Sequence, residues 1–300
     1  MRIFERLGDV MVRWLVLGLA VLLISCATPS SPAAPATPST SPTPINGKLR
    51  IGDRSLAMIC LGTGNPTVIL DAGNGGTAAG WSQVQLAAMK ITRVCAYDRA
   101  NLGTSDPAPL PRTLQDWTND LEHLLTASGL SAPYILVGHS YGGLNVRLYA
   151  AEHRQQVAGV ILVDSSHPDQ NARFRAALPA ASSSDSTDLV TFRGNLDDNR
   201  ILAPEQVRVA ESMQQVRAAG TLDPMPLIVI SRGQTEPAVD SKAINETLNQ
   251  VWSDLQQDLL NLSTHSRQII AEHSGHGVPQ QQPTVIVQAI EDMVRAVQTR

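Results

Sequence analysis

The pentapeptide Gly138-His139-Ser140-Tyr141-Gly142 stands between two different patterns. The apolar run Tyr134 to Val137 precedes it, and a helical stretch that contains Leu144, Leu148 and Ala151 follows it. A turn this tight between a strand and a helix admits only small residues two positions to either side of its centre. Ser140 should therefore be held out at the carboxyl edge of a sheet, over the positive end of the helix dipole. The pattern indicates a nucleophilic serine; the alternative is a serine that only caps the helix.

A serine hydroxyl is a weak nucleophile and requires a neighbouring base. Among the seven histidines, His276 lies in Glu-His-Ser-Gly-His-Gly (272–277), after the last expected strand and before the final helix. That loop should end at the same sheet edge as Ser140, so we expect His276 to be the base, with His273 as a weaker candidate. His139 is expected to point away from the serine. No cysteine or third histidine lies near the 273/276 pair, so no metal is expected.

The base requires an acid that fixes its tautomer and stabilises the imidazolium. Asp164 ends the expected strand 160–163, and Glu236 follows the next strand. Either strand end can reach the histidine; we favour Asp164 and retain Glu236 as the alternative. Asp98 and Asp106 precede the serine and are expected to order their own loop.

An oxyanion is stabilised by two backbone amides. One should come from Tyr141, directly after the nucleophile. The other should come from Asp71-Ala72-Gly73-Asn74-Gly75-Gly76, which follows the expected strand 67–70, and we assign it to Asn74.

The same loop imitates a dinucleotide-binding motif. Gly73-x-Gly75-x-x-Ala78 follows a strand, and Asp98 comes twenty residues after Ala78. This pattern would predict NAD binding. We set it aside because that motif should open a βαβ unit at the start of a domain and leaves the Ser140 turn unexplained. No cofactor is expected.

Outward from these motifs, residues 45–300 alternate short β-rich runs with helical periods. This alternation predicts one α/β domain with a mostly parallel sheet and helices on both faces. An antiparallel hairpin is expected at 48–59, and buried strands at 67–70, 93–97, 134–137, 160–163, 227–230 and 268–271. Apolar periodicity predicts helices around residues 114–125, which Gly129 should stop, around 244–259, and around 286–297, which Pro283 should open.

Residues 165 to 224 interrupt this rhythm, because no strand signal occurs in the segment. Residues 182–186 are almost only Ser and Asp, whereas Pro204 to Ala219, closed by Gly220, has a helical pattern. An insertion of this length is usually a lid or disordered. We expect a small helical cap over the carboxyl edge of the sheet.

Composition narrows the class of partner. Of 300 residues, 43% are hydrophobic, which is enough to fill a core. The net charge is −4, and there are only four Trp, four Tyr and three Phe residues, so a nucleic-acid partner is not expected.

The first 44 residues have the layout of a targeting segment. Arg2, Arg6 and Arg13 precede an eleven-residue apolar run, 14–24, which is too short to span a bilayer of about 30 Å. Residues 1–25 are expected to be a signal peptide. Residues 23–26, Leu-Ile-Ser-Cys, resemble a bacterial lipobox, which implies a lipid on Cys26 and a membrane-anchored, extracytoplasmic lipoprotein of the cell envelope. Residues 27–44 contain only Ala, Thr, Ser and Pro and are expected to form an extended linker.

Taken together, residues 45–300 resemble the α/β-hydrolase superfamily, specifically its esterase- and lipase-like serine-hydrolase branch. Ser140, a later acid and then His276 follow that family's order. Residues 96–105, Ala-Tyr-Asp-Arg-Ala-Asn-Leu-Gly-Thr-Ser, resemble a loop ahead of its nucleophile, with Asn101 where glycine is usual. Asn tolerates a left-handed backbone. Many members carry an Asp after the seventh strand, a position that here offers Glu236.

The resemblance implies an eight-stranded sheet and hydrolysis of a small-molecule carboxylic ester through an acyl-enzyme. A carbon–carbon hydrolase, an acyltransferase or a peptidase would use the same triad, and a non-catalytic ligand-binding protein would keep the fold. The strand order of the family also makes neighbours of the strands that carry Cys60 and Cys95. The resemblance thereby implies that these cysteines can pair outside the cytoplasm.

Overall fold

A computed structural model describes residues 45 to 299. The expected signal peptide, Cys26 and the linker to residue 44 lie outside these residues. Within the described residues, none of the helices has both the length and the apolar character needed to cross a membrane.

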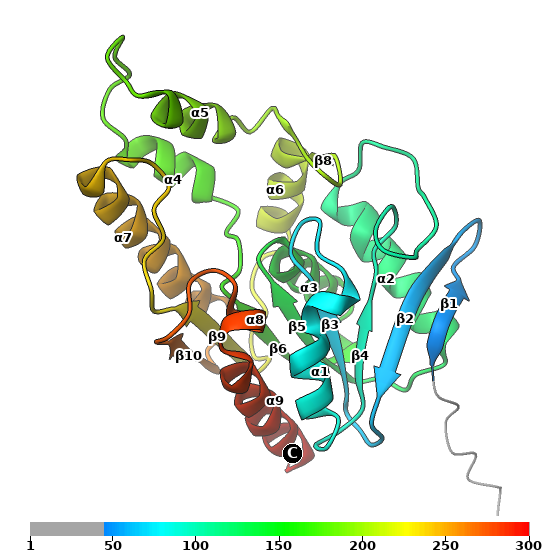
Figure 1. Cartoon of the computed structure of the whole chain (residues 1–300). Coiled ribbons are helices and arrows are strands. Elements are labelled where there is room, and N and C mark those ends of the chain that lie inside the picture. The colour runs from blue at the N-terminus through cyan, green and yellow to red at the C-terminus, as the bar shows by residue number, and fades with distance from the viewer. Residues whose placement is uncertain (1–44, 300) are drawn as a thin grey trace, which may run out of the picture. The chain divides into compact units, whose positions relative to one another are not determined.

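Eight strands form one mixed sheet, as expected (Figure 1). Its order is β1-β2-β4-β3-β5-β6-β9-β10; β2 runs antiparallel to β1 and β4, and all the other pairings are parallel. The carboxyl ends of β3, β5, β6, β9 and β10 therefore meet at one edge. The strands are β1 (Asn46–Arg50), β2 (Ser55–Leu61), β3 (Thr67–Asp71), β4 (Val94–Tyr97), β5 (Tyr134–His139), β6 (Val157–Val163), β9 (Leu227–Arg232) and β10 (Ser266–Ala271).

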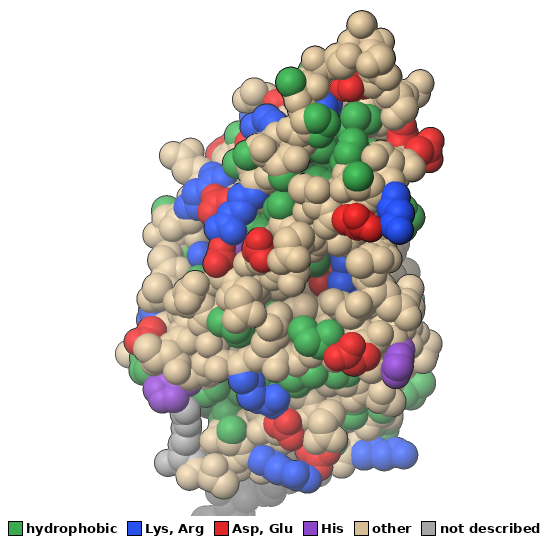
Figure 2. Space-filling view, turned by 90° about the vertical axis from the view of Figure 1, so that its left-hand side faces the viewer, with side chains coloured by type: hydrophobic (Ala, Val, Ile, Leu, Met, Phe, Trp, Pro, Cys, Tyr) green, Lys and Arg blue, Asp and Glu red, His purple; other side chains and the backbone are tan. Residues whose placement is uncertain are grey.

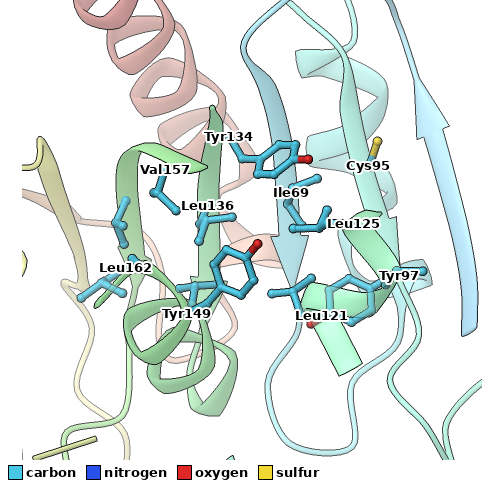
Figure 3. Close-up of a cluster of buried hydrophobic side chains, with 14 of the residues drawn as sticks. Ile69, Cys95, Tyr97, Leu121, Leu125, Tyr134, Leu136, Tyr149, Val157 and Leu162 are labelled. Atoms are coloured by element: carbon cyan, nitrogen blue, oxygen red, sulfur yellow. The ribbon is translucent and has the colours of Figure 1, made fainter. Parts of the chain in front are cut away.

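Helices cover both faces of the sheet because its central strands are apolar on both sides. On one face, Val68 and Ile135 share a buried cluster with side chains of α1 (Ser82–Ala88) and α9 (Pro283–Gln298). On the other face, Ile69 and Leu136 share a cluster with Leu121 and Leu125 of α2 (Leu114–Ser128) and Tyr149 of α3 (Tyr141–Glu152) (Figure 3). The remaining core helices are α7 (Lys242–Asp258), α8 (Val278–Gln281), η1 (Ala78–Trp81), η2 (Arg154–Gln156) and η3 (Leu259–Leu262).

The helix ends follow local chemistry. At the start of α2, the Thr113 side chain and Asp116 form a capping box, which satisfies two amides that the helix leaves unpaired. Gly129 ends α2 with φ 65°, a conformation that costs glycine nothing. Pro283 opens α9, as expected.

Residues 165–224 contain α4 (Gln170–Ala177), α5 (Thr187–Asn195), a short hairpin of β7 (Ile201–Leu202) and β8 (Val207–Arg208), and α6 (Val209–Ala218). The helix expected from Pro204 thus begins five residues later. The cause is a competing pairing with the core: Arg112 N donates to the Gln206 carbonyl at 3.0 Å, and Arg208 N donates to the Arg112 carbonyl at 2.8 Å. These bonds, with the pairing of β7 and β8, hold Val207 and Arg208 in an extended strand directly after the turn at Gln206.

The two halves of this cap rest on different parts of the core. Leu178 and Leu189 of the first half cluster with Leu248 of α7, and partly buried Phe174 and Phe192 pack against them. Met213 and Val216 of α6 instead cluster with side chains of α2 and α3. On the face in Figure 2, hydrophobic side chains gather in the upper part, with acidic and basic groups around them.

Cys60 of β2 and Cys95 of β4 form a disulfide. The two residues are direct antiparallel partners, with their Cα atoms 4.0 Å apart. The pairing that the family resemblance implied is therefore confirmed. The bond ties the antiparallel edge of the sheet to its parallel part.

The Cys60–Cys95 bond should stabilise the domain. We expect a Cys60→Ser/Cys95→Ser variant to lose about 2 to 4 kcal/mol of unfolding free energy, because the unfolded chain is no longer cross-linked. Urea denaturation with and without a reductant measures this loss. Reductant should destabilise the wild type and leave the double variant unchanged. Two free thiols in peptide mass spectra of the unreduced wild-type protein would contradict the assignment.

Candidate active site

Ser140 sits at the turn between β5 and α3 with φ 52° and ψ −122°, a strained conformation for a residue with a side chain. Its glycine neighbours explain how the turn closes. A Cβ on Gly138 would lie 2.4 Å from the Gly142 carbonyl oxygen, and one on Gly142 would lie 2.4 Å from the Ala72 carbonyl oxygen. Any larger residue at these two positions would collide with backbone. The turn thereby holds the Ser140 side chain at the carboxyl edge of the sheet.

The imidazole of His276 is hydrogen-bonded to Asp164, with 2.6 Å between Nδ1 and Oδ2. A carboxylate only accepts, so Nδ1 carries the proton and the neutral ring keeps Nε2 as its basic atom. Ser140 and His276 line the same cavity. The structure therefore brings together the three residues that the sequence selects.

Asp164 is fully buried at the end of β6 and is held from two further directions. Its Oδ1 accepts hydrogen bonds from Trp252 Nε1 at 2.8 Å and from the backbone N–H of Arg232 at 3.1 Å. Burial alone would raise the pKa of Asp164, but the hydrogen bond and charge of His276 and the Arg232 guanidinium outweigh it and keep that pKa below the ordinary value. The carboxylate is thus ionised and fixed opposite the imidazole.

Glu236, the alternative acid, contacts the backbone of His276 and not its ring. Its Oε1 accepts from the His276 N–H at 2.6 Å. A Cβ on Gly275 would lie 2.2 Å from the same oxygen, so a side chain at this position would displace the Glu236 carboxylate. Glu236 therefore anchors the loop that carries the histidine.

His139 lies against His276, a contact that the sequence did not suggest. Its Nε2 donates to the His276 carbonyl oxygen at 2.8 Å, and the two ring centroids are 4.7 Å apart. Burial and the neighbouring His276 lower the pKa of His139 to about 4, so it is neutral near pH 7. His273, the weaker candidate base, is exposed, and its backbone N–H donates to Gln282 Oε1 at 3.0 Å.

The loop after β3 lies beside the Ser140 turn. A Cβ on Gly73 would be 3.2 Å from Ser140 Cβ. Of the three following amides, Gly75 N donates to Glu205 Oε2 at 2.7 Å and Gly76 N donates to the Gly73 carbonyl at 2.9 Å. Within residues 45–299, no acceptor lies in hydrogen-bond range of the third amide, Asn74 N, which leaves it for a ligand. The Tyr141 amide is at the first position of α3, where no helix carbonyl can accept from it.

The cavity beside Ser140 has a volume of about 300 Å³. One part of its wall is apolar, and Arg232, Glu236, Asn249 and Gln170 supply polar groups. The apolar part comes from Phe174, Phe192, Leu248 and Trp252. Acyl transfer requires a hydroxyl, a base oriented by a carboxylate, and amide donors for an oxyanion. Ser140, His276 and Tyr141 line this pocket, and the loop that contains Asn74 lies beside the Ser140 turn.

Asp98 is the acidic residue of the pattern that imitates a dinucleotide motif, and it has a structural role. Its carboxylate accepts from Ala78 N at 2.8 Å and from Thr104 N at 3.0 Å. It orders the loops around it, as expected, and Asn101 takes the left-handed φ of 71° that its place in the loop requires. Within residues 45–299, no group of His, Cys, Asp and Glu side chains is arranged to hold a metal ion.

Comparisons with known proteins agree with this architecture. Residues 68–289 match the model of the alpha/beta hydrolase family. The YqjL protein of Bacillus subtilis is 26% identical over 233 residues, which cover 77% of this chain and 85% of that protein.

Solved structures share the fold at low sequence identity. A thermophilic esterase from Thermogutta terrifontis is 19% identical with a TM-score of 0.58, covering 83% of this chain and 98% of that one. The 2-hydroxy-6-oxo-6-phenylhexa-2,4-dienoate hydrolase of Rhodococcus sp. strain RHA1 is 16% identical with a TM-score of 0.58, covering 84% and 99%. With the family model matching most of the described residues, the chain belongs to the alpha/beta hydrolase family.

Proposed function

We propose that this protein is a serine hydrolase that cleaves small carboxylic esters through an acyl-enzyme. The observation that carries the proposal is the 2.6 Å contact of His276 Nδ1 with the buried Asp164, at a cavity that Ser140 also lines. The hydrogen bond leaves the second ring nitrogen unprotonated, as a base for the Ser140 hydroxyl requires.

In the first half of the reaction, Ser140 Oγ attacks the ester carbonyl carbon while His276 Nε2 accepts the hydroxyl proton. The carbonyl oxygen becomes an oxyanion, which accepts hydrogen bonds from the Asn74 and Tyr141 amides. The tetrahedral intermediate collapses, the carbon–oxygen bond to the alcohol breaks, and His276 returns the proton to that alcohol. Water then repeats the sequence on the acyl-enzyme and releases the acid.

Asp164 stabilises the imidazolium that exists between these proton transfers. Its carboxylate is ionised before the reaction begins, because its pKa is lowered by the bond from His276 and by the charge of Arg232 despite burial. Trp252 and the Arg232 amide hold the other oxygen, so the negative charge needs little reorganisation when the imidazolium forms.

The pocket supports a small substrate. A volume of about 300 Å³ with Phe174, Phe192 and Trp252 in its wall suits a short or aromatic acyl group. An esterase is among the structures with this fold, which supports ester cleavage as the reaction.

A fluorophosphonate probe and a series of nitrophenyl esters test the nucleophile. We expect the wild type to be labelled and to hydrolyse the shorter esters, and Ser140→Ala to lose labelling and all but a residual rate, roughly a 10⁶-fold drop in kcat. Ser128→Ala is a matched control, because Ser128 lies at the end of α2 that leads into the start of β5, at the opposite sheet edge. A wild-type protein that is folded yet unlabelled would favour a binding protein.

Substitution of the two candidate acids separates their roles. Asp164→Asn should lower kcat by about 10⁴, because the amide favours the wrong imidazole tautomer. Glu236→Gln keeps an acceptor for the His276 backbone N–H, so we expect a loss of about tenfold or less. The measurement is kcat on one nitrophenyl ester for each folded variant. A larger loss from Glu236→Gln would transfer the role of the acid to that residue.

We also propose that the domain is an extracytoplasmic lipoprotein, attached to a membrane by a lipid on Cys26. The Cys60–Cys95 disulfide supports an oxidising compartment, since such bonds are rare in the cytosol. The linker composition supports a tether that keeps the hydrolase domain away from the lipid surface.

Fractionation of cells that express the full chain tests the anchor. The wild type should sediment with membranes and carry a diacylglyceryl modification at Cys26 by mass spectrometry. Cys26→Ser should move the protein to the soluble fraction, because the lipid provides most of the binding free energy. Equal membrane association of both chains would contradict the proposal.

A further inference from the structure

Arg99 lies almost completely buried between two carboxylates, behind the loop that follows β3. Its Nη1 is 2.5 Å from Asp71 Oδ1, while Nε and Nη2 bind the two oxygens of Glu205 at 2.9 and 2.7 Å. The exposed fractions of the Arg99, Asp71 and Glu205 side chains are 3%, 0% and 2%. Burying such a set is expensive in desolvation and is not an efficient way to stabilise a fold.

The guanidinium also binds the backbone of the loop that follows β3. Nη1 donates to the Ala72 carbonyl and Nη2 donates to the Gly73 carbonyl, both at 2.7 Å. Trp117 stacks on the guanidinium, with 4.1 Å from Arg99 Cζ to the ring centroid. The two carboxylates and Trp117 thus hold the planar guanidinium in place. The guanidinium in turn holds two consecutive peptide oxygens.

The Gly73 carbonyl and the Asn74 N–H belong to one peptide unit. A trans peptide is planar, so its oxygen and its N–H point in opposite directions. Holding the Gly73 oxygen toward Arg99 turns the Asn74 N–H away from Arg99. A charged donor on that oxygen also polarises the peptide, which makes its N–H a better donor. Gly76 N donates to the same oxygen at 2.9 Å, so Arg99 and this amide together set the direction of the Asn74 N–H, while the charge of Arg99 adds to its strength as a donor.

Glu205 brings the cap into the same arrangement. Besides binding Arg99, its Oε2 accepts from Gly75 N at 2.7 Å, and Asn74 Nδ2 donates to the Ala203 carbonyl at 2.6 Å. A Cβ on Gly75 would lie 2.7 Å from Pro204 Cγ, so the two segments are in close contact. Residues 203–205 thus close over the outer side of the loop.

We propose that Arg99 and Glu205 are positioning residues that aim the Asn74 amide at the oxyanion, so that part of the cap completes the catalytic machinery. The inference rests on the proposed serine-hydrolase function and names the groups that support its oxyanion site. Neither side chain contacts the reacting atoms; both act through the Gly73–Asn74 peptide.

Arg99→Lys is the principal test. Lysine keeps the positive charge between Asp71 and Glu205, which favours folding, but a single ammonium cannot replace the planar fork that binds both carboxylates and both carbonyls. We expect kcat for nitrophenyl esters to fall by about 10- to 100-fold, somewhat less than complete removal of an oxyanion donor. KM should change by less than about threefold, because ground-state binding does not use the oxyanion contact.

A trifluoromethyl ketone provides a readout that a purely structural role would not move. It forms a tetrahedral adduct with the serine, and its oxyanion must be stabilised as the transition state is. Its affinity should therefore fall by the same factor as kcat. Fluorophosphonate titration of active sites corrects for any unfolded fraction.

Arg112→Lys is the matched control. Arg112 is also buried against a carboxylate, Asp120, at 2.8 Å, but its side chain binds the Asp116 carbonyl on α2 and not the loop after β3. Its substitution should lower the melting temperature without changing kcat or ketone affinity per active site. Glu205→Gln is a second variant, because it keeps the size of the side chain while breaking the two-oxygen match to Arg99; it should reproduce the selective loss in weaker form.

The outcomes separate the two proposals. If the wild type is neither labelled nor active, the proposed function fails and the positioning role fails with it. If the wild type is active and Arg99→Lys and Glu205→Gln keep wild-type kcat and ketone affinity, only the positioning role is wrong. Equal losses in Arg112→Lys would also overturn it, since any buried arginine would then have the same effect.

Discussion

The hydrogen bond between His276 and Asp164 is the interaction on which the site depends. It joins residues 112 positions apart in the chain, so it exists only if β6 and β10 end at the same edge of the sheet. Parallel strands satisfy this condition because all their carboxyl ends point the same way. The buried face formed with α2 and α3, and the opposite face formed with α1 and α9, hold these strand ends in place. A short loop on each strand end is then sufficient to complete the geometry.

Glycines allow the remaining pieces to approach. The Ser140 turn needs Gly138 and Gly142 because backbone atoms occupy the space of a side chain at both positions. At Gly275 in the histidine loop, the space that a side chain would take is occupied by the Glu236 side chain. Backbone strain at the Ser140 turn and the close contacts around it cost folding free energy. Burial of the large core behind the sheet edge compensates for this cost.

Much of this arrangement could be predicted from local pattern. The strands and the principal helices follow from apolar periodicity, and the Ser140 turn follows from its glycines and from the strand and helix that flank it. The sequence left Asp164 and Glu236 as alternatives because both follow strands, and only the structure shows that one reaches the ring while the other reaches the backbone. The contacts of His139 and Arg99 had no sequence signal, since each depends on residues far away in the chain. The start of α6 was misplaced because a long-range pairing with Arg112 outweighed local helical preference.

The cap's division into two halves has a consequence for how this protein can diversify. Its second half, with α6, is fastened to α2, α3 and the loop after β3, whereas its first half, which supplies Phe174 and Phe192 to the pocket wall, rests on α7. Mutations in the first half can reshape the pocket while the backbone beside Ser140 keeps its geometry. Selection for a new substrate can thus act on one half of the insertion without dismantling the chemistry that the other half supports.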